Sequence, residues 1–412
     1  MKRSIEVMAP AGSFDSLMAA LQGGAHSVYF GVEQLNMRAR ATMNFTLEDI
    51  HEVARLCKEN GARSYITLNT IVYDHDLSVI KTIIQAAKDA GITAIIAADQ
   101  AVIAYARSVG MEVHISTQVN VTNIETVKFY SLFADTIVLA RELSLTQIKK
   151  ITDAIQAEQI KGPSGRLMEI EIFVHGALCM AVSGKCYLSL HTHNASANRG
   201  ACVQNCRRTY QVIDREEGHE LAIDNEYIMS AQDLCTIDFI DQVLDSGVSV
   251  LKIEGRGKGP EYVKTVTKCY REAVDACLAG TYTPEKAKVW KEKMENVYNR
   301  GFWSGYYLGQ HLGEWTNTSG SKAKLRKVYL GKGNKYFGKI GVAEFLIETH
   351  TLRKGDSILI TGPTTGVIET TAEELHTSQG AVEEAVQGDL CSIKLDTPIR
   401  KSDKLYKLVA TA

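Results

Sequence analysis

Nine cysteines occur in the chain, and five of them fall in the stretch from Cys179 to Cys235. A chain of 412 residues can bury a core without disulfides, and clustered thiols in a reducing compartment more often bind a metal or do chemistry. Four thiolates meet the requirement of an iron–sulfur cluster or of a structural zinc ion. We therefore expect a metal centre with four thiolate ligands, for which five cysteines are candidates. They are Cys179, Cys186, Cys202, Cys206 and Cys235.

The spacing of these cysteines favours an iron–sulfur cluster over zinc. Structural zinc sites usually pair closely spaced cysteines, and here only Cys202 and Cys206 are close together. The C-x3-C-x2-C motif of radical-SAM enzymes is absent, because Thr209 stands where the third cysteine belongs. A disulfide or simple burial remains the alternative. We assign the remaining cysteines to the hydrophobic core: Cys57, Cys269, Cys277 and Cys391.

Other catalytic signatures give little support for hydrolysis. The sequence contains neither H-E-x-x-H nor G-x-S-x-G. The segment from Gly333 to Lys339 resembles a P-loop, but Ile340 replaces the required Ser or Thr. His191 and His193 could serve as ligands or could simply be solvated. His175 is better placed as a general acid or base, because it follows a predicted strand directly.

The elements that must position these side chains repeat one pattern: an amphipathic helix, a glycine and a short apolar strand. Short apolar strands are typical of a parallel sheet that is buried on both faces. Eight such units predict an α/β fold, a (β/α)8 TIM-like barrel over about residues 1–280. An open doubly wound sheet is the alternative, but no G-x-G-x-x-G follows the first strand. The predicted strands are Ile5–Met8, Ser27–Phe30, Ser64–Leu68, Ala94–Ala97, Glu112–Ser116, Thr136–Leu139, Glu169–Val174 and Ser249–Ile253.

Polar residues follow the predicted strands, where a barrel of this type carries its active site. Several arginines at one barrel mouth suit an anionic ligand, and the loop Gly255–Pro260 could hold phosphate on its amides. The alternative is that loops are polar in any protein. The ring comprises Asn36, Arg38, Asn69, Gln118, Arg141, Glu142, His175, Glu254 and Arg256.

The chain changes character towards its C-terminus. Short strands separated by turns from residue 323 to 412 predict a small β-barrel, after a linker near Trp315–Lys322. Residues 1–315 then form the catalytic barrel, with a long cysteine-bearing insertion after strand 7 at about 176–229. Basic residues among aromatic ones in the small domain could bind RNA, or could form a solvated strand pair. The expected RNA-binding residues are Lys322, Lys324, Arg326, Lys327 and Lys335.

Composition limits the classes of partner. Lys and Arg total 46 against 48 Asp and Glu, so any surface for nucleic acid must be local. The sequence shows no signal-peptide core and no apolar run long enough to span a membrane. We expect a cytoplasmic protein with no membrane partner.

Several motifs resemble those of peptidase family U32, the collagenase-like peptidases. They include EIFVHGALCMAVSGKCYLS, NRGACVQNCRRTY, SAQDLC and KIEGRGKGPEYV. The resemblance is strongest to family members that make 5-hydroxyuridine at the wobble position of tRNA without dioxygen, using prephenate. It implies a [4Fe–4S] cluster on Cys179, Cys186, Cys202 and Cys235, with Cys206 as rival for the third place.

The same resemblance implies roles for the ring of polar residues. Arg38, Arg141 and Arg256 would bind the prephenate carboxylates or an RNA phosphate, while Asn69, Gln118 and Glu254 would read the uracil edge. An electron donor or a second subunit is also left open. Two other functions remain as alternatives: a U32-type peptidase, and a scaffold subunit whose cluster is structural.

Overall fold

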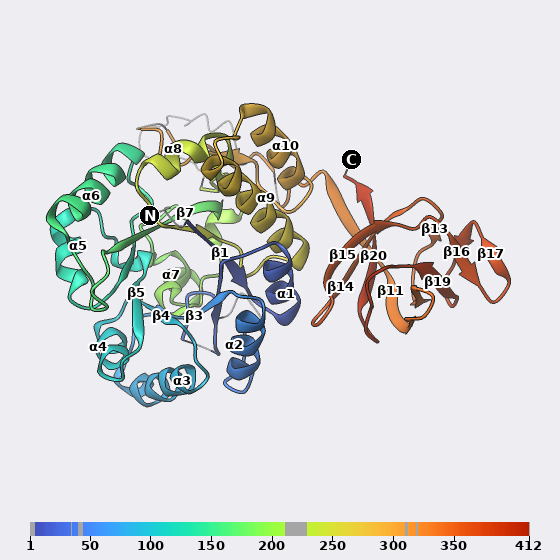
Figure 1. The fold of residues 1–412 in the computed structure, drawn as a ribbon, viewed down its shortest axis with the longest axis horizontal. Coiled ribbons are helices and arrows are strands. Elements are labelled where there is room, and N and C mark those ends of the chain that lie inside the picture. Colours follow the sequence, from blue (N-terminus) through green and yellow to red (C-terminus); the bar gives the residue numbers. More distant parts are fainter. Residues whose placement is uncertain are drawn as a thin grey trace.

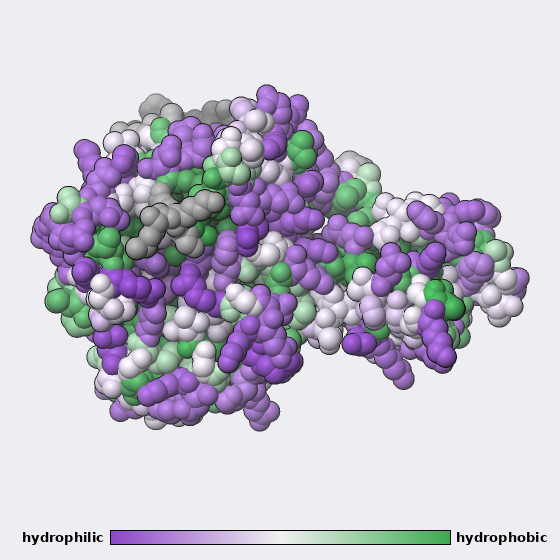
Figure 2. Space-filling view, in the orientation of Figure 1, coloured by the Kyte–Doolittle hydropathy of each residue, from purple (hydrophilic) through white to green (hydrophobic). Residues whose placement is uncertain are grey.

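The computed structural model describes residues 5–33, 35–39, 44–210, 229–309, 312–318 and 320–411. It consists of a barrel surrounded by helices and a smaller sheet domain at its side, beyond α1 and α9 (Figure 1). Hydrophilic side chains cover most of the visible face of both domains (Figure 2). None of the described helices combines the length and the apolar character needed to cross a lipid bilayer.

Eight parallel strands close into a barrel, which confirms the predicted fold class. Each strand pairs with its neighbour in chain order, and β9 pairs with both β1 and β7 to close the ring. The order around the ring is β1, β2, β3, β4, β5, β6, β7, β9. These strands span Glu6–Ala11, Ser27–Gly31, Arg63–Leu68, Ala94–Ala97, Glu112–Ile115, Thr136–Val138, Glu169–Ala177 and Val250–Ile253.

The helices begin and end where local sequence signals place their ends. Ser144 opens α6 with a capping box to Gln147, and Asn123 accepts a hydrogen bond from the backbone of Thr126 at the start of α5. The glycines expected after five helices all have positive φ, as predicted: Gly24, Gly61, Gly91, Gly110 and Gly247. The helices that cover the barrel are α1 (Phe14–Gln22), α2 (Asp49–Glu59), α3 (Leu77–Asp89), α4 (Gln100–Ser108), α5 (Ile124–Ser131), α6 (Leu145–Glu158), α8 (Ile240–Asp245), α9 (Pro260–Leu278) and α10 (Pro284–Glu295).

Two short strands extend the barrel sheet beyond the expected eight. The strand β8 (Asp233–Cys235) runs antiparallel to the end of β7, and β10 (Phe302–Trp303) pairs with β8. This pairing lengthens β7 to Ala177, three residues past the predicted end at Val174. The inserted loop therefore leaves the barrel later than expected. Residues 211–228 of the insertion lie outside the described part of the chain.

The barrel interior holds a buried network of charges as well as apolar side chains. Lys252 Nζ lies 2.6 Å from Glu171 Oε1, and Glu171 Oε2 lies 3.4 Å from His114 Nδ1. All three side chains are at least nine-tenths buried. Buried charges are tolerated when they are paired with one another. The network lies beside an apolar cluster that includes Met8, Tyr29, Tyr65, Ala94, Ile96 and Val250.

The C-terminal domain is an antiparallel sheet with its own apolar core. Among the described strands its order is β15, β14, β20, β11, β12, β19, β16, β17, and β13 (Leu352–Arg353) pairs separately with β18 (Glu384–Ala385). Leu330, Phe345 and Leu405 are fully buried inside it. The main strands are β11 (Leu325–Phe337), β12 (Val342–Ile347), β14 (Ser357–Gly362), β15 (Gly366–Thr371), β16 (Leu375–Thr377), β17 (Gly380–Val382), β19 (Leu390–Lys394) and β20 (Lys404–Ala410).

The two domains are joined by specific contacts. The side chain of Gln22 on α1 bonds the backbone of both Thr365 and Val367, at 2.8 and 2.9 Å. Lys264 on α9 donates to the carbonyl of Val367 at 2.8 Å. Leu359 and Val367 belong to the apolar core of the barrel domain. The small domain therefore packs against α1 and α9 along one side of the barrel (Figure 1).

Candidate active site at the barrel mouth

A pocket of about 600 Å³ lies at the carboxyl ends of the barrel strands. This is the end at which barrels of this class carry their active sites. Strand ends provide one part of its lining, and the loop that follows β7 provides the other. All six residues expected to bind substrate line the pocket, although their roles stay predictions: Arg38, Asn69, Gln118, Arg141, Glu254 and Arg256.

The cysteine-bearing loop is held over the barrel by side chains that bond backbone. Arg199 donates to the carbonyl of Ile71 at 2.8 Å and forms an ion pair with Asp76. Arg207 donates to the carbonyl of Leu178 at 2.6 Å and to Ser230 Oγ at 3.0 Å. These contacts fix both halves of the described loop to the barrel and carry its thiols to the pocket.

A glycine permits the closest approach of this loop to the barrel. Gly200 has a φ of +80°, and a Cβ at this position would lie 2.3 Å from the carbonyl oxygen of Asn36. No larger residue fits without moving the backbone. The glycine of the Arg-Gly-Ala-Cys motif therefore sets how near Cys202 comes to the loop that carries Arg38.

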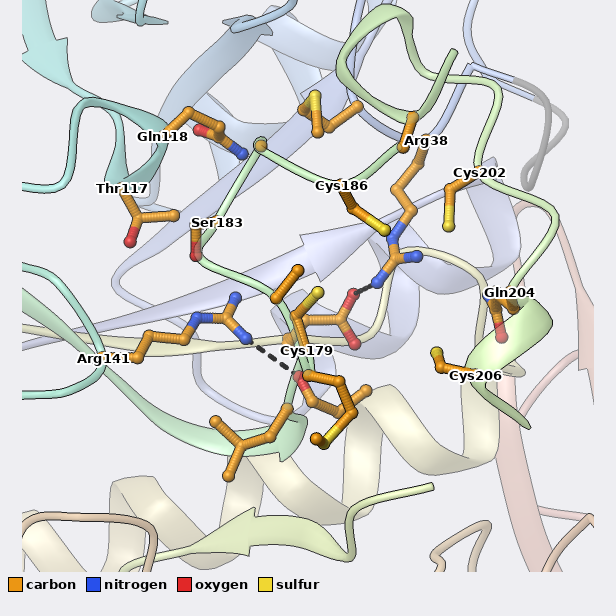
Figure 3. A pocket seen from close by; sticks show the side chains of 18 of the residues that line it. Arg38, Thr117, Gln118, Arg141, Cys179, Ser183, Cys186, Cys202, Gln204 and Cys206 are labelled. Atoms are coloured by element: carbon orange, nitrogen blue, oxygen red, sulfur yellow. Dashed lines mark hydrogen bonds and ion pairs between the residues drawn. The ribbon is translucent and has the colours of Figure 1, made fainter. Parts of the chain in front are cut away.

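Four of the five candidate thiols line the pocket. Cys179, Cys186, Cys202 and Cys206 are all pocket residues, and Figure 3 shows Cys186 and Cys202 on either side of the Arg38 guanidinium. Cys235 lies elsewhere: its side chain is buried on β8, with Sγ 3.9 Å from the Tyr270 hydroxyl. Burial raises the pKa of this thiol to about 12. The structure therefore groups Cys206, and not the expected Cys235, with the other three thiols, and which four cysteines bind a cluster stays a prediction.

The sulfurs do not yet form a metal-binding geometry. Within the described ranges, no three His, Cys, Asp or Glu side chains are close enough together to hold a metal ion. The donor set nevertheless suits an iron–sulfur cluster, because four free thiols from one loop share one pocket with cations such as Arg38 and Arg207. All nine cysteines are free, and Cys57, Cys269 and Cys391 are buried as expected of core residues.

His175, the expected general acid or base, lies outside the pocket. It is 2% exposed, is not a pocket residue, and packs against the rings of Tyr262, Tyr270 and Phe302. Burial lowers its pKa to about 3, so the ring is neutral near physiological pH. The cause is a β-bulge after Phe173, which places His175 opposite Ile253 and turns its side chain towards α9.

An ion pair and an amide cluster order the polar wall of the pocket. Arg38 Nη2 lies 2.7 Å from Glu254 Oε1. Burial alone would raise the pKa of Glu254, but Arg38 and Lys258 outweigh it and lower the pKa to about 2. Asn69 donates to Ser116 Oγ and to Gln118 Oε1, both at 3.2 Å. The pocket therefore contains a fixed carboxylate beside amide groups that can exchange hydrogen bonds with a ligand.

Two other arginines of the pocket, Arg141 and Arg256, bond only neutral acceptors within the described part of the chain. Arg256 Nη1 donates to Asn36 Oδ1 and Thr67 Oγ1, both at 2.9 Å. Arg141 Nη1 donates to the carbonyl of Ala177 at 3.0 Å (Figure 3), and its Nε is buried without a partner in the described residues. Burial lowers the pKa of Arg256 to about 10, which still leaves it charged near neutral pH. Both groups can bind an anion.

Sequence reasoning overlooked five cations that line the pocket: Lys185, Arg207, Lys252, Lys258 and Arg300. Burial, followed by the charge of Arg300, lowers the pKa of Lys258 to about 8, and its Nζ lies 3.0 Å from the centroid of the Tyr298 ring. One signal was present for Lys252: it is a lysine within an otherwise apolar strand of a predicted barrel. Such a side chain must either face the lumen or be paired.

The basic residues of the C-terminal domain divide into two groups. Lys327 forms an ion pair with Glu261 on α9 at 2.9 Å, and Lys324 pairs with Glu295 on α10. These two lysines join the domains. Arg326 and Lys335 are exposed, and Lys322 is half-buried. A role in RNA binding stays a prediction for all five.

Fold and pocket together define a (β/α)8-barrel protein with a thiol-lined, cation-rich pocket at its mouth. The model of peptidase family U32 matches residues 12–317, and the chain belongs to this family. The protein named collagenase from Porphyromonas gingivalis strain W83 is 56% identical over 402 residues, which are 98% of this chain and 97% of that protein.

Two further relatives have names that refer to RNA. The tRNA hydroxylation protein P1 of Bacillus subtilis is 31% identical over 413 residues, covering 98% of this chain and 94% of that protein. The 23S rRNA 5-hydroxycytidine C2501 synthase of Escherichia coli is 35% identical over 275 residues, covering 66% of this chain and 40% of that protein.

Proposed function

We propose that this protein is an RNA-modifying enzyme that hydroxylates the wobble uridine of tRNA to 5-hydroxyuridine, with a [4Fe–4S] cluster and prephenate as co-substrate. The observation that carries the proposal is that four free thiols and several cations line one pocket at the barrel mouth. The relatives named for tRNA and rRNA hydroxylation support the reaction class.

The cluster would be held by Cys179, Cys186, Cys202 and Cys206. When bound it would supply one-electron chemistry or a structural anchor for the loop. Arg38 and Arg207 would offset the negative charge of the thiolates, since both guanidiniums line the same pocket.

The chain's own residues provide the remaining functions of the site. Arg141 and Arg256 would bind the carboxylates of the co-substrate, because guanidinium groups match carboxylates bidentately. Asn69 and Gln118 would exchange their mutual hydrogen bond for bonds to the uracil edge. Lys322, Arg326 and Lys335 would contact the RNA backbone outside the pocket.

Iron and sulfide analysis after anaerobic purification tests the proposal. We expect about four irons and four sulfides per chain, the content of one such cluster. Cys179→Ala, Cys186→Ala, Cys202→Ala and Cys206→Ala should lose the iron, and Cys235→Ala is the matched control that keeps it. Zinc in place of iron, or no metal after anaerobic reconstitution, contradicts the proposal. Nucleoside analysis of tRNA from cells lacking the protein then checks for loss of 5-hydroxyuridine.

The peptidase alternative is favoured by the relative named collagenase. The pocket gives it little support, because no histidine is among the described residues that line it, so no Ser–His or Cys–His pair can form there. Cleavage of denatured collagen by the purified protein, at a rate unaffected by loss of the four thiols, would favour the peptidase.

A further inference from the structure

A buried lysine forms part of the pocket floor. Lys252 lies on β9 with its side chain 5% exposed, and it lines the same pocket as the thiols. Its Nζ is 4.6 Å from the centroid of the Tyr29 ring and 5.5 Å from that of Phe173. A primary amine in such an aromatic, desolvated setting is a nucleophile once it is deprotonated.

A carboxylate is in place to accept the proton of this amine. Glu171 Oε1 lies 2.6 Å from Lys252 Nζ, and the other carboxylate oxygen faces His114 Nδ1 at 3.4 Å. Burial lowers the pKa of Lys252, and the charges of Arg256 and Arg141 act in the same direction, while Glu171 opposes them. Burial would raise the pKa of Glu171, but Lys252 and His114 outweigh it and lower this pKa, so the resting proton stays on the amine. The 2.6 Å contact gives that proton a direct route to the carboxylate.

Two guanidinium groups lie near the amine and act on its charge. Arg256 Cζ lies 5.8 Å from the centroid of Tyr29, and Arg141 Cζ lies 3.9 Å from the centroid of Phe173. These are the two rings that also flank Lys252. Both guanidiniums bond neutral acceptors in the described structure, and Arg141 Nε is buried without a partner there. A carboxylate bound between them would lie close to the amine.

We propose that Lys252 forms an imine with a 2-oxo acid whose carboxylate is bound by Arg141 and Arg256. Glu171 first takes one proton from the ammonium group, and the nitrogen attacks the keto carbon. The carbonyl oxygen takes a second proton from the nitrogen to become a hydroxyl, and Glu171 returns its proton to this hydroxyl. A C=N bond replaces the C=O bond, and the third proton stays on the imine nitrogen. The keto oxygen leaves as one water molecule, and no atom is oxidised or reduced.

This inference rests on the proposed function only through the pocket that both use. Imine formation needs neither a cluster nor RNA, so the two proposals can fail separately. If Lys252 serves only to balance the charge of Glu171 inside the barrel, the ion pair persists and no adduct forms. A trapped covalent adduct is therefore a readout that a purely structural lysine does not give.

The test is reductive trapping of the full chain with pyruvate and cyanoborohydride, followed by peptide mass mapping. We expect a reduced pyruvyl adduct on Lys252 in the wild type and none at this position in Lys252→Arg, which keeps the charge. The matched control is Lys258→Arg, another pocket lysine, which should keep the adduct on Lys252. Acetone lacks the carboxylate, so it should label Lys252 at least about tenfold less than pyruvate.

Two further variants test the binding of the carboxylate. Arg141→Gln and Arg256→Gln should each raise the pyruvate concentration for half-maximal trapping by about tenfold or more. No adduct on Lys252 at saturating pyruvate, an adduct on Lys258 instead, or equal labelling by acetone overturns the proposal. The peptide mass map of the wild-type protein shows whether Lys252 carries the adduct, so the proposal can be tested even if a variant fails to fold. Labelling of Cys206→Ala, which should lack iron, shows whether the adduct is independent of the cluster.

Discussion

Arg38 and Glu254 form an ion pair of 2.7 Å that joins the loop after β2 to the end of β9, inside the pocket. The two residues are more than two hundred positions apart in the sequence, and barrel closure between β1 and β9 brings them together. The Glu254 side chain is 11% exposed, so water screens the pair only weakly. This pair fixes one wall of the pocket. Arg38 therefore bonds a charged partner, whereas the hydrogen bonds of Arg141 and Arg256 within the described residues go to neutral acceptors.

Replacing Glu254 by Gln should lower the free energy of unfolding by about 3 kcal/mol near neutral pH, because it leaves Arg38 without this partner. The pKa of Glu254 is lower in the folded chain than in the unfolded chain, so its contribution is present above pH 4.5 and is lost as the pH falls towards about 2. Urea unfolding of both proteins at several pH values measures the difference. Glu52→Gln is the control, since the Glu52–Arg55 pair is exposed and should contribute little.

His175 should affect stability rather than the pH profile of activity. Its pKa falls from 6.5 to about 3 on folding, so the stabilising effect of the neutral ring is complete above pH 6.5 and declines below it. One proton taken up on unfolding gives a slope of about 1.4 kcal/mol per pH unit. His175→Phe should remove this slope in urea unfolding below pH 6.5, while Phe302→Leu removes a neighbouring ring and keeps it. An unchanged slope in His175→Phe contradicts the assignment.

Gly200→Ala should disturb the cysteine-bearing loop, because the new Cβ would meet the carbonyl oxygen of Asn36 at 2.3 Å. We expect iron loading to fall and hydrogen exchange in the loop to rise, both measured against wild type. Gly280→Ala is the matched control. It also has positive φ, but its Cβ meets nothing within 4 Å, so it carries only the backbone strain, a cost of about 1 kcal/mol. Equal effects of the two changes would show that the contact with Asn36 is unimportant.

The basic residues of the C-terminal domain should differ in their effect on RNA. Arg326→Ala and Lys335→Ala should weaken tRNA binding and reduce the slope of log affinity against log salt by about one each, if each contacts a phosphate. Lys327→Ala should change binding less, because Lys327 is paired with Glu261. Fluorescence anisotropy across a salt series measures both quantities. A larger loss for Lys327→Ala than for Arg326→Ala contradicts this division.

Local patterns in the sequence were sufficient to predict the barrel. Each αβ unit carries its own signals, namely an apolar helix stripe, a glycine with positive φ and a short apolar strand. These signals act over a few residues, so they can be read without knowledge of distant contacts. The same logic placed six polar residues in the pocket, because the carboxyl ends of parallel strands meet at one end of a barrel.

The structure brings together three of the four expected metal ligands. Cys179, Cys186 and Cys202 line the pocket, but the fourth pocket thiol is Cys206. Cys235 lies on β8, whose pairing with β7 places it opposite His175. No local pattern signals a three-residue strand that runs antiparallel to the end of a barrel strand. The side on which its residues point depends on that pairing.

The sequence by itself determined the αβ repeat, the end of the barrel that bears the site, and the residue types available for chemistry. Only the tertiary structure decided which of them face the pocket. A bulge after Phe173 turned His175 outwards, and the pairing of β7 with β9 placed Lys252 beside Glu171. The physical reason is that a strand alternates its side chains between two faces. A one-residue change of register, set by a distant partner, therefore reverses which side chain meets the substrate.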